Sequence, residues 1–549
     1  MSADRAEVAG TLRALDRAFE ELIVRGLEAS GPDDVRRLDA IGEELARAGA
    51  AYAAGAVRDL VHGVREGGAG SPRRLLRAQT VMRVFERVLS LDAAAELLGG
   101  AAPPADESAP SADEPAIAPI APIAPIAPIA PIAPIAPIAS TAPIASTAPH
   151  APAPPAPPSP APAPPPAQLD DAAHAALVPI LAELTQVIEG LVASGMTTAS
   201  KATRAKLDAS FREASRLRLG RLAASIRYVI DETGRFLADD GTFAARRLAF
   251  FVHRTWLIAR GLADAIGRGD RAAIARLLLQ PAAPVAAPLL RLAVIGVHKR
   301  ALLDGSAAFE FRARTLAAAA TLPAGARVVW SCVFGAKKGV PAEAFLHLPQ
   351  PQKFAPKLLL EPTEIHVTDA AVTVDDSGAA RLHLGPKSKV VAGPPFAGWS
   401  ALVAPDLVGR GETDRRARAA ARVRRHRATP LDLEVELHEE VVLDGWEAGP
   451  PAPSEHRPER TIVPIRVPGL ALDAIISTGP DGAELGEALA RMAKKNAVRP
   501  PLYGLVHYEL GTLVFQPLST VGDHGPDHLM ISRGKIDLAS LMKTLDFST

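Results

Sequence analysis

Potential metal ligands are densest in the segment Asp523-His524-Gly525-Pro526-Asp527-His528. Imidazole and carboxylate groups suit divalent metal ions. Gly525 and Pro526, however, interrupt the helix that would place His524 and His528 on one face. We therefore interpret the segment as a polar loop between strands, and we assign no metal ligand and no cofactor to it.

Three other motifs match catalytic or phosphate-binding patterns only in part. Lys337-Lys338-Gly339 lacks the glycine-rich lead of a P-loop. Ser400, within Gly398-Trp399-Ser400-Ala401-Leu402, lacks the second glycine of a nucleophile elbow. Cys332 lies between Trp330 and Phe334 in an apolar stretch that predicts a buried, inert thiol. We assign no catalytic residue from these motifs.

A cluster of arginines is the strongest candidate for binding. Seven arginines fall within Arg415 to Arg427, and on a helix four of them share an arc of roughly 80°. Arginine suits bidentate contacts to oxyanions, so this stripe can bind phosphate or an acidic protein face. The alternative is a solvated helix or loop whose arginines pair with nearby acidic residues. The candidate residues are Arg415, Arg418, Arg422 and Arg425.

A proline-rich stretch divides the elements that would position these residues. Pro103 to Gln168 contains 23 of the 51 prolines and seven consecutive Ile-Ala-Pro triplets from Ile117 to Pro137. Proline at every third position prevents both helix and interior strand, which leaves polyproline II. We expect residues 101–168 to be a disordered linker that spans on the order of 200 Å when fully extended.

Helical periodicity occurs on both sides of this linker. Apolar residues recur at helical spacing over residues 1–100 and again over 169–280. Gly26-Leu27-Glu28-Ala29-Ser30 is similar to Gly190-Leu191-Val192-Ala193-Ser194, and Arg73-Arg74-Leu75 is similar to Arg246-Arg247-Leu248. We therefore predict two related all-α bundles that arose by internal duplication and fold independently. Shared composition of two Ala- and Arg-rich segments is the alternative.

In the rest of the chain, the apolar residues recur with a different period. A short Pro-rich connector at 281–290 precedes residues 291–549, where apolar residues alternate as in strands. This pattern predicts an α+β, strand-rich domain with room for two subdomains divided near 428–458. The complete expectation is a multidomain chain of two helical bundles, a linker and this domain.

Composition limits the classes of protein that fit. Lys and Arg together number 61, as do Asp and Glu, so bulk charge does not indicate nucleic acid. The single cysteine and the lack of a signal-peptide pattern at the N-terminus indicate a cytoplasmic protein. Arginine far exceeds lysine, which is typical of a GC-rich bacterial genome. No apolar run is long enough to predict a membrane span.

These features favour a non-enzymatic function over an enzymatic one. The sequence predicts a scaffold or adaptor that binds other proteins through tethered helical modules and the α+β domain. One alternative is an enzyme or enzyme subunit with a site in the C-terminal domain. Another is a nucleic-acid-associated accessory factor that acts through Arg415 to Arg427, although this stretch has no aromatic residue for base stacking.

Overall fold

The computed structural model consists of a helical region and a strand-rich region. The fold class predicted from the sequence is confirmed in this layout. The predicted linker lies outside the described residues. The structure describes residues 2–68, 70–99, 171–278, 284–302, 306–335, 340–374, 379–408, 413–426, 429–431, 439–454, 460–476, 480–493, 499–509 and 512–532.

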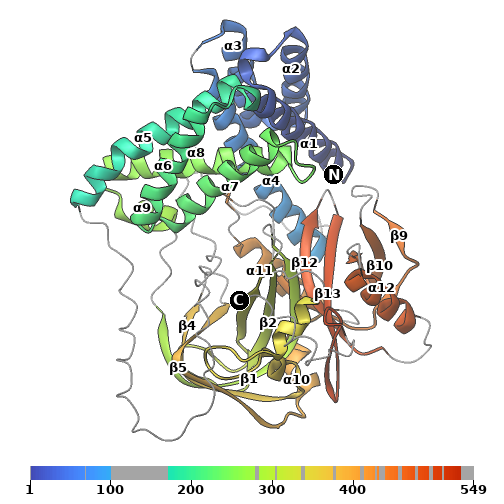
Figure 1. Ribbon diagram of the computed structural model, residues 1–549. Coiled ribbons are helices and arrows are strands. Elements are labelled where there is room, and N and C mark those ends of the chain that lie inside the picture. Colours follow the sequence, from blue (N-terminus) through green and yellow to red (C-terminus); the bar gives the residue numbers. More distant parts are fainter. Residues whose placement is uncertain are drawn as a thin grey trace, which may run out of the picture.

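The helices of the first and second modules gather in one layer, and a single long helix runs from this layer to the strands (Figure 1). The first module consists of α1 (Ser2–Arg25), α2 (Pro32–Arg47), α3 (Ala51–Glu66) and α4 (Ser71–Gly99). The second consists of α5 (Asp171–Ser194), α6 (Lys201–Arg216), α7 (Gly220–Leu237), α8 (Ala245–Gly267) and α9 (Arg271–Leu278).

Capping residues account for several helix boundaries. Proline at the first position of α2 loses no helical hydrogen bond, and the backbone N–H of Gly31 donates to Asp34 Oδ2 at 2.9 Å. The hydroxyl of Ser200 accepts from the backbone N–H of Thr203 at the start of α6. Gly67 ends α3 in the left-handed conformation, with φ of 61°.

The two modules share one hydrophobic core, which differs from our expectation of independent bundles. Phe19 and Leu22 of α1 belong to the same buried cluster as Ile188 of α5 and Phe251 of α8. Helix α1 packs on α8, and α4 packs on both α5 and α8. Periodicity identifies an apolar face but not the partner that covers it. Each module therefore completes the core of the other.

The structure also gives the register of the duplication. Single-turn 3-10 helices, η1 (Leu27–Ala29) and η2 (Met196–Thr198), follow α1 and α5. Met196 follows Leu27 by 169 residues, and Lys201 follows Pro32 by the same number. Gly26 therefore corresponds to Gly195. The sequence match of Gly26 with Gly190 was wrong in register because both glycines precede similar small and apolar residues.

The modules meet at these two equivalent glycines. A Cβ on Gly26 would lie 2.5 Å from the carbonyl carbon of Ser194, and one on Gly195 would lie 2.3 Å from the carbonyl oxygen of Arg25. Their φ angles of 95° and 77° are also unfavourable for other residues. Only glycine allows the two backbones to approach this closely. The reciprocal contacts place a pseudo-twofold axis between the modules.

Charged residues follow the same pseudo-symmetry. Arg73 of α4 donates to both carboxylate oxygens of Glu189 on α5 at 2.8 Å. Glu20 is the equivalent of Glu189, and it faces Arg246 of α8 and Arg83 of α4. A carboxylate from the first helix of each module thus faces an arginine from the fourth helix of the other.

Five strands close a barrel after the helices. Strand β1 pairs with β2 and β4, and β3 lies parallel to β5, so the order around the barrel is β1-β2-β3-β5-β4. This is the strand order of the OB fold, a five-stranded Greek-key barrel. The strands are β1 (Val285–Ala301), β2 (Ala307–Thr315), β3 (Arg327–Phe334), β4 (Thr363–Val374) and β5 (Ala380–Pro395).

A second, nine-stranded sheet packs against the outside of β1. Ala293 and Ile295 of β1 share a buried cluster with Tyr503 and Leu518 of this sheet. Its main order is β6-β7-β12-β13-β11-β10-β8, with β14 beside β13 and β9 beside β10. The strands are β6 (Leu407–Val408), β7 (Glu439–Leu443), β8 (Glu447–Ala448), β9 (Ala452–Pro453), β10 (Thr461–Val467), β11 (Leu470–Ile476), β12 (Leu502–Glu509), β13 (Thr512–Gly522) and β14 (Gly525–His528).

Helix α4 joins the helical layer to this sheet. Leu75 and Leu76 near its start belong to the shared helical core. Ala93, Ala94 and Leu98 near its end belong to the core of the second sheet. Helix α11 (Thr413–Arg425) packs beside this end of α4. One helix of 29 residues therefore fixes the first module to the strand-rich region.

One described helix is long and apolar enough to meet the length and composition criteria for a membrane span. It is the stretch Ala176–Ser194 of α5, of which 44% is buried inside the protein. Core helices meet the same criteria, and α5 packs on α8 in the shared core. This single helix is weak support for a membrane-spanning segment.

Glu20 makes the stability of the module interface dependent on pH. Burial and the nearby charge of Asp16 raise the pKa of Glu20 from 4.5 to about 7, although Arg246 and Arg83 act in the opposite direction. The folded state therefore holds this proton more tightly than the unfolded chain does. The resulting stabilisation is full below about pH 4.5 and is lost as the pH rises through about 7.

We expect Glu20→Gln to raise the melting temperature above pH 7 and to change it little near pH 4.5, because glutamine carries no charge at either pH. Thermal unfolding followed by circular dichroism over this range checks the prediction. Glu43→Gln, at an exposed position of α2, is the matched control. Equal pH profiles for Glu20→Gln and the wild type would contradict it.

Candidate functional site

The arginine-rich segment forms helix α11, as the sequence predicted. Alanine and arginine favour helix, and Ala419, Ala420 and Val423 form its buried face. Arginines in the last turn also interact favourably with the negative end of the helix dipole. The buried face packs on α4, so the remaining arginines are distributed over the other faces.

The four predicted arginines do not form one uniform basic stripe. Arg418 and Arg425 are exposed, and Arg415 is half-buried. Arg422 points inward, where its Nε donates to Glu439 Oε1 at 2.6 Å and its Nη2 lies 3.5 Å from Asp406 Oδ1. Arg422 therefore stabilises the fold. The acidic residues near α11 that we considered as an alternative do pair with part of it.

Two arginines outside the predicted set also have defined positions. Arg416 donates from Nε to the carbonyl oxygen of Leu98 at 2.9 Å and from Nη2 to that of Leu97 at 3.2 Å. These carbonyls end α4, where cationic donors are favourable. Arg424 is exposed. The exposed arginines of α11 are thus Arg418, Arg424 and Arg425, and none of the three forms an ion pair with a described residue.

Arg422 belongs to a buried network of ion pairs between the barrel and the second sheet. Arg314 of β2 lies 2.6 Å from Glu440 Oε2 and donates to Asp406 Oδ2 at 2.8 Å. Arg327 of β3 contacts Glu439, Glu440 and the same Asp406. The network comprises Arg312, Arg314, Arg327 and Arg422 with Glu310, Asp406, Glu439 and Glu440.

This network keeps its members charged near neutral pH. Burial alone would raise the pKa of Glu440, but Arg314, Arg327 and Arg312 outweigh burial and hold its pKa well below the usual range. Burial would lower the pKa of Arg314, but Glu440 and Asp406 outweigh it and raise this pKa. A general acid or base needs a pKa near the working pH. The network is therefore suited to holding the two sheets together and unsuited to proton transfer.

The network also covers the face that OB barrels commonly use for ligands. In that fold, the surface of the second and third strands and two adjoining loops bind oligonucleotides or oligosaccharides. Here Arg312, Arg314 and Arg327 project from these strands onto Glu439 and Glu440 of β7. This part of the surface is buried inside the protein. The barrel topology alone therefore does not support binding of nucleic acid.

The histidines of the C-terminal motif lie on a hairpin. His524 is exposed in the turn between β13 and β14, and His528 lies opposite Ser519 in the ladder. Burial lowers the pKa of His528 to about 4. Among the described residues no group of three or more His, Cys, Asp or Glu could hold a metal ion. The segment predicted as a loop thus includes the short strand β14.

The other motifs do not form a catalytic arrangement in the described residues. The hydroxyl of Ser400 donates directly to Asp523 Oδ1 at 2.8 Å, without an intervening histidine. Burial raises the pKa of Cys332 to about 12, which keeps the thiol protonated and poorly nucleophilic. Lys337, Lys338 and Gly339 lie outside the described residues.

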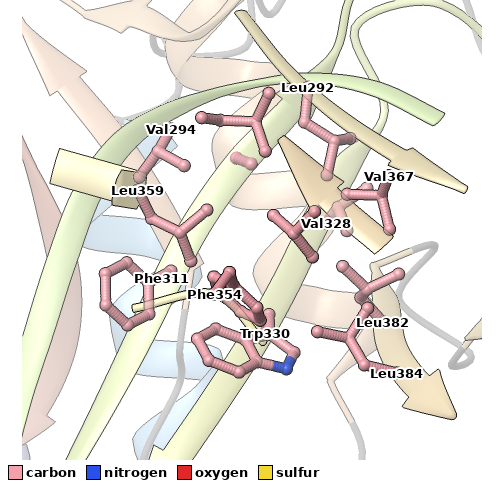
Figure 2. Close-up of a pocket in the computed structure, with 13 residues that line it drawn as sticks. Leu292, Val294, Phe311, Val328, Trp330, Phe354, Leu359, Val367, Leu382 and Leu384 are labelled. Carbon is pink, nitrogen blue, oxygen red and sulfur yellow. The ribbon is translucent and has the colours of Figure 1, made fainter. Parts of the chain in front are cut away.

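A small cavity occupies the interior of the barrel (Figure 2). Its volume is about 20 Å³, which is enough for about one water molecule. The labelled side chains, such as Phe311, Trp330 and Leu359, point toward one another across it. All lining residues are apolar. The cavity is an incompletely filled core that offers no polar group for chemistry.

The fold combines two packed helical modules with an OB-type barrel and an attached sheet. No family model and no curated protein matches the sequence. A solved structure described as "Molecular basis for abrogation of activation of pro-inflammatory cytokines" has 9% identity and a TM-score of 0.22, and covers 47% of this chain and 98% of that one. The "Crystal structure of the tetrameric p202 HIN2" has 8% identity and a TM-score of 0.17, and covers 42% and 89%. Likenesses this weak indicate no function.

Removal of one buried arginine tests the role of the network. Arg314→Met leaves Glu440 buried with fewer counter-charges, so we expect a loss of about 3–5 kcal/mol in the free energy of unfolding. Arg418→Met removes an exposed charge and should change stability by less than about 0.5 kcal/mol. Urea unfolding followed by tryptophan fluorescence measures both. Similar small losses in the two variants would contradict a structural role for the network.

Proposed function

We propose that the protein is a non-enzymatic scaffold or adaptor that binds an acidic segment of another protein on the exposed face of α11. The observation that carries this proposal is the pair Arg418 and Arg425, which are exposed on a helix whose opposite face is buried. They are seven residues apart, so they lie on nearly the same face about 10 Å apart along the axis. Carboxylates at a similar spacing fit them.

The position of α11 supports this role. The helix is held by its buried alanines, by Arg416 at the end of α4 and by Arg422 in the ion network. A fixed backbone reduces the entropy that binding must overcome. Guanidinium groups form bidentate hydrogen bonds with carboxylates, which adds directional specificity. The buried arginines hold the helix in place, and the exposed arginines are available for contact. The exposed face of α11 is therefore suited to docking.

Two features, the barrel cavity and the buried ion network, favour a binding protein over an enzyme. The barrel cavity has an apolar lining and room for about one water. The strongly shifted pKa values of Glu440 and Arg314 reflect mutual ion pairs that keep both groups charged. Neither feature resembles a pocket with convergent polar groups and a titratable residue near neutral pH.

Charge reversal at two residues tests the proposed face. We expect Arg418→Glu with Arg425→Glu to weaken binding of a labelled glutamate-rich peptide at least tenfold, because attraction becomes repulsion. The fold should be retained, since neither residue belongs to the ion network. Fluorescence anisotropy at several salt concentrations measures the affinity, and the wild type should bind more weakly as salt increases.

The matched control is Lys387→Glu with Lys389→Glu, which changes the net charge equally at exposed positions of β5. An equal loss of affinity in this variant would show that bulk charge, not α11, attracts the peptide. A duplex DNA fragment serves as a second probe. If DNA binds more tightly than the peptide and depends on the same arginines, the acidic-protein proposal is wrong.

A further inference from the structure

Residues 1–99 make two sets of contacts with the rest of the chain. In the first set, Gly26 meets Gly195 and Arg73 pairs with Glu189 across the pseudo-twofold axis. In the second set, the end of α4 packs beside α11 and shares the core of the second sheet. The two sets fix the whole N-terminal module on residues 171–532.

Polar contacts anchor the second set. The buried Arg87 donates from Nε to the carbonyl oxygen of Thr429 at 3.0 Å, and Arg416 donates to the carbonyl of Leu98. Both bonds join the N-terminal module to residues beyond 400. The covalent connection between the two sides passes through residues 100–170 alone. None of these contacts requires that the two sides belong to the same copy of the chain.

We propose that the protein forms a dimer by exchanging residues 1–99, so that the partner is a second copy of this chain. In the exchanged dimer each copy places its first module on the second module and α11 of the other copy. All the contacts described above are kept, and the arrangement closes with twofold symmetry. The exchanged and unexchanged forms differ mainly in the connection between them.

The length of that connection determines how much dimer forms. A tether gives the intramolecular arrangement an effective concentration, which is in the millimolar range for short flexible linkers and falls as the linker lengthens. Residues 100–170 form a long connection. Exchange should therefore become measurable as the protein concentration approaches about 0.1–1 mM.

A pair of complementary charge reversals tests the exchange in the full-length chain. Arg73→Glu alone places two carboxylates at the contact, and Glu189→Arg alone places two guanidinium groups there. An exchanged dimer can contain one chain of each variant. At one contact the two substituted residues meet, and at the other the native Arg73 and Glu189 meet. Both contacts then join opposite charges. Each variant alone has no such arrangement.

The two variants are mixed, refolded together from urea and concentrated. We expect a heterodimer fraction several-fold above the dimer fraction of either variant alone, by light scattering with size-exclusion chromatography and by native mass spectrometry. The control mixture is Arg37→Glu with Glu21→Arg. This ion pair joins α1 and α2, so both partners move together and exchange cannot restore it.

A variant mixture that contains no more dimer than the control mixture would overturn the proposal. A second measurement does not depend on the stability of the variants. Wild-type chains with two different tags are refolded together at up to about 1 mM, near the effective concentration of a tether. Recovery of both tags in one complex, in a fraction that rises with concentration, supports exchange. Their complete separation would also overturn it.

Discussion

The structure depends on α4, because this helix belongs to two hydrophobic cores. Its first turns belong to the core that the two helical modules share, and its last turns pack beside α11 and the second sheet. A helix of 29 residues is about 43 Å long, which is enough to cross from one layer to the other. Displacement of the helical layer therefore requires that α4 leave one of its cores. Helix α4 therefore links the core of the modules to the core of the second sheet.

The arginines of α11 differ in their electrostatic surroundings. Arg422 faces Glu439 and Asp406 in a buried network, where removal of one partner is costly. Arg418 and Arg425 remain in solvent, where they are free to meet a partner. The same residue type thus takes part in the buried junction on one face of the helix and is exposed on another, where we propose that a partner binds.

Local sequence patterns were enough to predict much of this fold. They could not predict its long-range contacts. The helices of both modules and the strand-rich character of the C-terminal region follow from the period of the apolar residues. In β2, Glu310, Arg312 and Arg314 alternate with apolar residues, which is also the pattern of a solvent-exposed face. Only the fold shows that this face meets Glu439 and Glu440, so the ion network was missed and Arg422 was assigned to binding. Barrel closure likewise depends on pairings that no local pattern specifies.

The central claim is that the two helical modules form one cooperative unit around Gly26 and Gly195. Native-state hydrogen exchange of Gly26→Ala tests it most directly, because a Cβ there clashes with the backbone of Ser194. Gly49→Ala is the control, since its φ of 79° brings similar strain but its Cβ would meet nothing within 4 Å. We predict that Gly26→Ala lowers protection in α5 and α8 as much as in α1 and α4, beyond the loss in the control. A loss confined to α1–α4 would show that the modules are independent.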